Sequence, residues 1–103
     1  MKLLTLAIAA LFAAAGPAWA GPEDAMNKAG CMACHTKDKK LVGPAFKDIS
    51  AKYKGKADAE STLIAKVRTG GKGVFGPIPM SPNPPDKISD ADLKASVQWI
   101  LQQ

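Results

Sequence analysis

The segment Gly30-Cys31-Met32-Ala33-Cys34-His35 contains both cysteines and the only histidine of this 103-residue chain. Two thiols separated by two residues lie about one helical turn apart, and the histidine follows directly. This C-x-x-C-H pattern is typical of c-type haem attachment, because two such thiols can add to the two vinyl groups of one haem. We therefore predict one covalently bound haem, attached through Cys31 and Cys34, with His35 beneath the iron as its proximal ligand.

Other functions for the C-x-x-C-H segment are less consistent with the sequence. A thioredoxin-like redox pair needs a preceding strand, and none is expected before Cys31. A closed zinc site needs four good ligands, and a Ser-His-Asp triad would have to be built around His35 alone. A disulfide between Cys31 and Cys34 would close a very short loop and add little stability. A copper(I) carrier that uses both thiolates and the thioether of Met32 or Met80 is a further alternative, but it gives His35 no role.

The amino terminus has the pattern of an export signal. Lys2 is followed by an apolar run from Leu3 to Ala15 and by the small-x-small site Ala18-Trp19-Ala20. The run is too short for a membrane span, which needs about 20 apolar residues. We expect residues 1–20 to be a cleaved secretory signal peptide and residues 21–103 to form one domain in the periplasm. Without Lys2, the 14 basic and 9 acidic side chains of the whole chain leave a net charge of +4.

Four helices and no strand are expected after the signal. The first runs from Pro22 to about Ala29, with a proline and two acids in its first turn. The second lies between Pro44 and Gly55, and the third begins at Asp58 as N-cap and ends at Gly70-Gly71. Ser89 should cap the last helix. Apolar residues at helical spacing on the last three are Phe46, Ile49 and Tyr53, then Leu63, Ile64 and Val67, and finally Leu93, Val97, Ile100 and Leu101.

The cap of the last helix has two further features. Ser89 as N-cap places Asp92 at the third helical position, where its backbone N–H can reach the serine hydroxyl. Ile88 then precedes the cap and Leu93 follows as the fourth helical residue, the spacing of a hydrophobic staple. This is the best specified helix of the chain.

The segment from Gly70 to Lys87 contains four glycines and five prolines in 18 residues. This composition excludes regular structure, and so long a loop in a small domain is usually functional. With no second histidine, the candidates for the sixth ligand of the iron are Met26, Met32, Met80 and solvent. Met26 lies in the entry helix and Met32 between the attachment cysteines, whereas Met80 lies on this loop between prolines. We therefore predict Met80 as the ligand; the alternative is an apolar plug.

These motifs resemble the short-chain, soluble class I cytochromes c of the bacterial periplasm. The resemblance rests on the C-x-x-C-H segment, on Val42-Gly43-Pro44-Ala45, on Gly73-Val74-Phe75-Gly76-Pro77-Ile78-Pro79-Met80 and on Trp99. It implies an all-α fold of about four short helices and a long loop around one covalent haem c. His35 and Met80 would be the axial ligands.

The resemblance also implies roles for residues around the ligands. The Pro44 carbonyl would accept the Nδ1 proton of His35, and Asn83 would support the Met80 sulfur. Two positions depart from the usual pattern: Phe75 replaces a tryptophan whose indole N–H donates to a haem propionate, and Lys66 replaces an arginine. Residues 81–88 also form a longer connection than in most relatives.

The predicted activity is one-electron, outer-sphere transfer rather than enzymatic catalysis, because two axial ligands leave no site for substrate. Histidine with methionine raises the reduction potential. An open iron used for catalysis or gas sensing is the main alternative. An apolar shell around the iron is expected from Phe46, Ile49, Leu63, Val67, Val74, Ile78, Val97 and Ile100.

The expected partners are redox proteins. A membrane quinol-oxidising complex would be the donor and a terminal oxidase or periplasmic reductase the acceptor, with no nucleic acid and no stable membrane association. We expect a monomer. A basic rim that guides acidic partners is predicted from Lys28, Lys39, Lys40, Lys66, Arg68 and Lys72.

Overall fold

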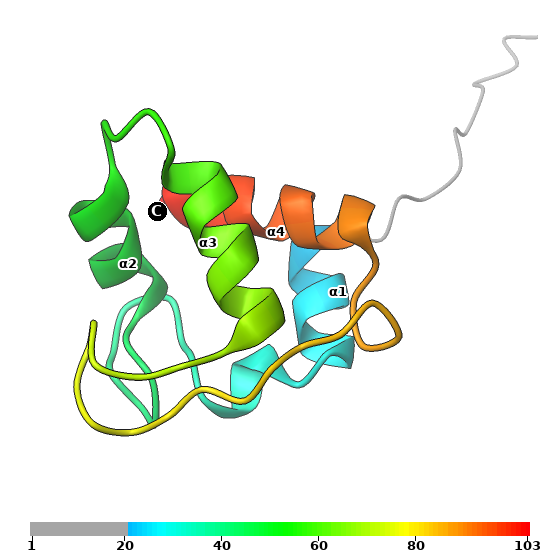
Figure 1. The fold of residues 1–103 in the computed structure, drawn as a ribbon, viewed down its shortest axis with the longest axis horizontal. Coiled ribbons are helices and arrows are strands. Elements are labelled where there is room, and N and C mark those ends of the chain that lie inside the picture. The colour runs from blue at the N-terminus through cyan, green and yellow to red at the C-terminus, as the bar shows by residue number, and fades with distance from the viewer. Residues whose placement is uncertain (1–20) are drawn as a thin grey trace, which may run out of the picture.

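The computed structural model describes residues 21–103 as four α-helices and one short 3-10 turn, with no β-sheet in that range (Figure 1). The elements are α1 (Pro22–Lys28), η1 (Cys31–Ala33), α2 (Phe46–Tyr53), α3 (Ala59–Thr69) and α4 (Asp90–Leu101). The all-α prediction is confirmed. The predicted signal peptide, residues 1–20, lies outside the described part of the chain. Within the described part, no helix has the length and apolar character that a membrane crossing requires.

Helix α4 is the element against which the other helices pack. It contacts α1, α2 and α3, and Figure 1 shows α1 and α2 towards its two ends with α3 crossing in front. On α4 itself, Leu93, Val97 and Ile100 are buried. The Ser50 hydroxyl of α2 donates to the Leu101 carbonyl at 2.9 Å, which fixes α2 on the end of α4. The rest of the core comes from Met26, Ala29, Phe46, Ile49, Tyr53, Ala59, Leu63 and Ile88.

The start of α4 follows the sequence prediction, and the start of α3 differs in one respect. The Ser89 hydroxyl accepts a hydrogen bond from the Asp92 backbone N–H at 3.2 Å, and both members of the expected staple are buried in one cluster. Asp58 is the N-cap residue of α3, but its φ of −101° and ψ of 11° are not extended and its side chain caps no backbone N–H. The carboxylate instead accepts from the Thr62 hydroxyl at 3.3 Å, because a side-chain cap requires an extended N-cap residue.

The long loop is closed at its base by two backbone hydrogen bonds. Gly71 donates to the Met80 carbonyl at 3.0 Å, and Met80 donates to the Gly71 carbonyl at 2.8 Å. At the tip, Gly73 donates to the carbonyl of Gly76 at 2.8 Å. The loop is therefore irregular, as predicted, and Met80 lies at its hydrogen-bonded base.

Arg68 ties the end of α3 to the chain that leads into α4. Its guanidinium donates to the carbonyls of Asn83 and Ile88, at 3.0 and 2.8 Å, and pairs with the Asp90 carboxylate at 2.5 Å. The prediction that Arg68 belongs to a basic rim is wrong, because its charge is neutralised within the fold.

Gly70, at the junction of α3 and the loop, is the position where a side chain would disturb this closure most. Its φ is 69°, and an added Cβ would collide with the Met80 carbonyl oxygen and lie 2.9 Å from the Pro82 nitrogen. We predict that Gly70→Ala lowers the free energy of unfolding by about 1–3 kcal/mol more than Gly73→Ala. Gly73 also has a positive φ, 104°, but nothing lies within 4 Å of its Cβ position. Denaturant unfolding of both variants tests this, and equal losses would contradict it.

Candidate functional site

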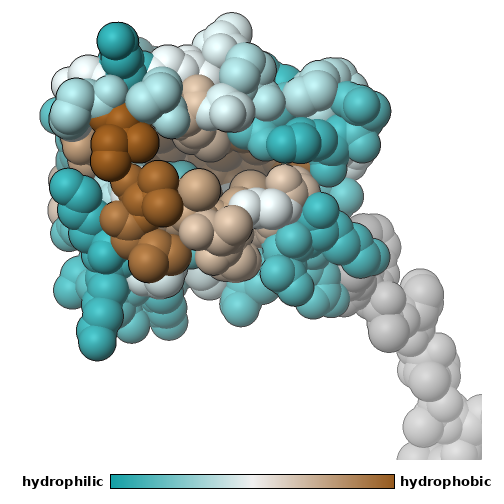
Figure 2. Space-filling model, turned by 90° about the horizontal axis from the view of Figure 1, so that it is seen from below, coloured by the Kyte–Doolittle hydropathy of each residue, from teal (hydrophilic) through white to brown (hydrophobic). Residues whose placement is uncertain are grey.

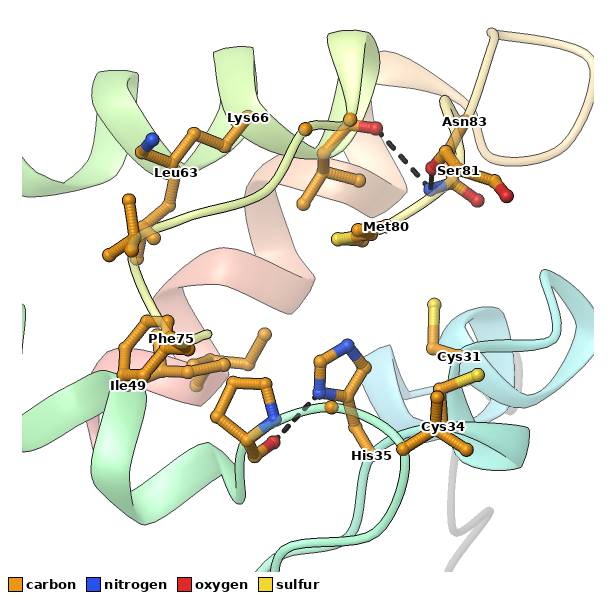
Figure 3. A pocket seen from close by; sticks show the side chains of 18 of the residues that line it. Cys31, Cys34, His35, Ile49, Leu63, Lys66, Phe75, Met80, Ser81 and Asn83 are labelled. Carbon is orange, nitrogen blue, oxygen red and sulfur yellow. Dashed lines mark hydrogen bonds between the residues drawn. The ribbon is translucent and has the colours of Figure 1, made fainter. Parts of the chain in front are cut away.

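A cavity of about 570 Å³ lies among the helices, the cysteine segment and the long loop. Cys31, Cys34, His35 and Met80 all line it. Figure 3 shows His35 and Met80 on opposite sides of the cavity and the two cysteines together at one end. All residues of the predicted apolar shell also line it, namely Phe46, Ile49, Leu63, Val67, Val74, Ile78, Val97 and Ile100.

Figure 2 shows hydrophobic side chains at the mouth of this hollow and hydrophilic side chains around it. The exposed large apolar residues of the described chain are Leu41, Val42, Val74, Phe75 and Ile78. Val74 and Ile78 were expected within the shell, and they line the cavity with 41% and 57% of their surface exposed. The cavity is thus an apolar slot that opens to one face of the molecule.

A single turn of chain places both thiols and the imidazole. The backbone N–H groups of Cys34 and His35 donate to the Cys31 carbonyl at 3.1 and 3.0 Å. Both cysteines are free thiols. Burial raises the pKa of the Cys31 thiol above its usual value, opposed in part by a backbone hydrogen bond and by the nearby positive charge of Lys87.

The His35 ring is held from its edge and its face. The ring Nδ1 lies 2.8 Å from the Pro44 carbonyl oxygen, so Nδ1 carries the proton and donates it. In the neutral ring, Nε2 then has the lone pair. The ring also stacks on Phe46, with centroids 5.5 Å apart and planes at 20°, and Phe46 meets the edge of Trp99 at 5.5 Å.

Gly43 allows the chain to pass close to the imidazole. A Cβ built on Gly43 would lie 2.5 Å from Cε1 of His35 and 2.9 Å from its Nδ1. Contacts below 3.0 Å would force the ring or the backbone to move. The Gly43 N–H donates to the Cys34 carbonyl at 2.8 Å, which keeps this segment against the cysteine turn. The motif Val42-Gly43-Pro44-Ala45 therefore serves the orientation of His35.

Asn83 acts on the backbone that follows Met80. Its side-chain amide donates to the carbonyls of Ser81 at 3.0 Å and Val67 at 3.3 Å, and its backbone N–H donates to the Val67 carbonyl at 3.0 Å (Figure 3). The resemblance implied support of the Met80 sulfur. The hydrogen bonds of Asn83 join it to α3 and to the backbone of Ser81, the residue after Met80.

The charged residues that line the described cavity are all lysines. They are Lys40, Lys66, Lys72 and Lys87, and no aspartate or glutamate is among the lining residues. Lys28 and Lys39, expected in the basic rim, do not line the cavity. Lys87 was missed because its position follows from the path of the loop, which no local pattern in the sequence encodes. A ligand in this slot would therefore meet apolar walls and positive charge.

These features fit a haem. The slot offers apolar walls to a flat macrocycle, an imidazole and a thioether on its two sides, and two thiols at one end. Lys66 and Phe75 line the other end (Figure 3), and lysine charge suits the two carboxylates of the porphyrin.

Comparison with known proteins agrees with a haem site. The Cytochrome c family model matches residues 14–103. Cytochrome c2 of Rubrivivax gelatinosus is 47% identical over 83 residues, covering 81% of this chain and 98% of the relative. Cytochrome c-551 of Pseudomonas aeruginosa is 46% identical over 87 residues, covering 84% and 81%. The crystal structure of Nitrosomonas europaea cytochrome c552 superposes with a TM-score of 0.71 at 51% identity, covering 77% of this chain and 95% of that one. The chain therefore belongs to the cytochrome c family of small electron carriers, which hold one covalently attached haem c.

Proposed function

We propose that this protein is an exported, periplasmic electron carrier in which Cys31 and Cys34 bind the haem as thioethers and His35 and Met80 ligate its iron. The observation that carries the proposal is the arrangement of His35 and Met80 on opposite sides of one apolar slot (Figure 3). Bound haem supplies one-electron exchange between Fe(III) and Fe(II). The chain contributes the ligands, the exclusion of water and the orientation of the imidazole.

Each ligand has its own support in the chain. The Pro44 carbonyl fixes the imidazole tautomer, so that Nε2 of His35 is available to a metal. The hydrogen-bonded pair of Gly71 and Met80 fixes the thioether from the other side. Histidine with methionine favours a high reduction potential, and an apolar shell acts in the same direction.

Outer-sphere transfer without enzymatic activity follows from this ligand set. If His35 and Met80 both ligate the iron, no coordination site would be open to a substrate. The partners would be redox proteins, such as a membrane quinol-oxidising complex as donor and a terminal oxidase or periplasmic reductase as acceptor. A monomer suffices for brief encounters with each of them.

Covalent attachment gives the first prediction. Haem should stay with the wild-type polypeptide through acid–acetone extraction and denaturing electrophoresis, because two thioether bonds hold it. In the double variant Cys31→Ala, Cys34→Ala, we expect loss of that retention and of most of the folded protein, since the slot is central to the fold. Haem staining of the gel is the measurement, and freely extracted haem from the wild type would contradict the proposal.

The assignment of Met80 gives the second prediction. Met80→Ala should open the sixth position to water or added ligands and lower the reduction potential, while the covalent haem is retained. Met26 is buried in the core, with 2% of its surface exposed, so Met26→Ala should cost about 2–5 kcal/mol of stability without change in the ferric spectrum. Met32→Ala is the second control. If Met80→Ala has the spectrum and potential of the wild type, Met80 is an apolar plug and not a ligand.

The lysines around the slot give the third prediction. The rate of electron transfer to an acidic partner should fall as salt is added, because salt screens the attraction between these lysines and the acidic groups of the partner. Lys87→Gln should lower the rate at low salt severalfold, since Lys87 lines the slot near Cys31. Lys94→Gln, an exposed change on α4, should have less effect. Stopped-flow rates at several ionic strengths test this. Rates independent of salt would show that these lysines are ordinary solvated surface residues that do not attract the partner.

A further inference from the structure

The two ends of the slot differ in chemistry, and this difference orients the haem. Both cysteines lie at one end, whereas Phe75 and Lys66 line the opposite end (Figure 3). In a porphyrin of the haem type, the vinyl groups and the two propionates occupy opposite halves of the ring. If the vinyl half meets Cys31 and Cys34, the carboxylates are directed to the end with Phe75 and Lys66. This step rests on the function proposed above.

Phe75 cannot donate a hydrogen bond to a carboxylate, yet its ring brings a cation to that end. The Lys52 ammonium lies 5.7 Å from the centroid of the Phe75 ring, within the range of a cation–π contact. Lys52 is an exposed residue of α2, three positions after the cavity-lining Ile49. Residues three apart share a helix face. Lys52 is therefore next to the slot although it does not line it.

No carboxylate among residues 21–103 forms an ion pair with this ammonium in the structure. The one ion pair found between residues 21 and 103 joins Arg68 to Asp90, and the cavity lining contains no acidic side chain. Lys52 and Lys66 thus supply two positive charges at the end of the slot where two carboxylates are expected. Charge-assisted hydrogen bonds of this kind are about twice as strong as neutral ones.

We propose that Lys52, held over the Phe75 ring, is a binding residue for a haem propionate, with Lys66 serving the same end of the slot. Phe75 is then a positioning residue: its ring holds the Lys52 ammonium in place, but it makes no hydrogen bond to the carboxylate itself. A positive charge paired with a propionate disfavours the extra positive charge of Fe(III). Lys52 therefore raises the reduction potential of the bound iron.

The test is a redox titration of purified holoprotein, read at the haem absorption bands. Lys52→Gln should lower the reduction potential, and the decrease should persist at high ionic strength because a paired, close charge is screened little. Lys47→Gln is the matched control: it removes an equal charge from the same helix at an exposed position that neither lines the slot nor contacts Phe75. Its effect should be smaller and should vanish with salt. Lys52→Arg should restore most of the potential.

A second variant tests the role of Phe75. If the ring positions the ammonium, Lys52→Gln should lower the potential less in a Phe75→Leu background than in the wild type. Equal shifts for Lys52→Gln and Lys47→Gln, or a Lys52 effect that disappears at high salt, would overturn the proposal while leaving the haem assignment intact. Preparations without a haem spectrum would instead contradict the proposed function itself.

Discussion

The contact on which the site depends is the hydrogen bond between His35 Nδ1 and the Pro44 carbonyl, 2.8 Å long. It commits one ring nitrogen to the chain and leaves the other for a metal. Gly43 lets the backbone pass close to the ring because it has no side chain. Phe46 stacks on the ring, with the two centroids 5.5 Å apart. Because Phe46 begins α2, the same residues that orient the imidazole also start the helix that packs on α4.

The opposite wall of the slot, which contains Met80, is stabilised in a different way. A loop rich in glycine and proline has no regular series of backbone hydrogen bonds, so its base must be fixed by specific contacts. The Gly71–Met80 pair closes the base, Asn83 joins the outgoing chain to α3, and Arg68 joins α3 to the entry of α4. The thioether is thus held by the main chain and by residues that never touch it. Such support lowers the ordering cost of a ligand on an otherwise irregular segment.

The features that could be predicted from the sequence are those with local signals. The C-x-x-C-H segment, the helical spacing of Phe46, Ile49 and Tyr53, and the Ser89 cap each depend on neighbours within a few residues. Errors arose where a residue's partner is distant in the chain: Arg68 pairs with Asp90, and Lys87 reaches the slot through the path of the loop. The missing side-chain cap at Asp58 has a backbone cause, since its dihedral angles are not extended. The contact of Lys52 could not be predicted from the sequence for the same reason, because only the fold places its ammonium over the Phe75 ring.

The coordination of the iron is the central claim, and the optical spectrum of the purified, haem-loaded protein tests it most directly. Two axial ligands from His35 and Met80 predict a low-spin c-type spectrum in both oxidation states, with the weak methionine-to-iron charge-transfer band in the ferric form. A high-spin ferric spectrum would show an open sixth position and would contradict Met80 as a ligand. Absence of haem absorption would contradict the cofactor itself and would favour a thiolate site for a soft metal ion such as copper(I).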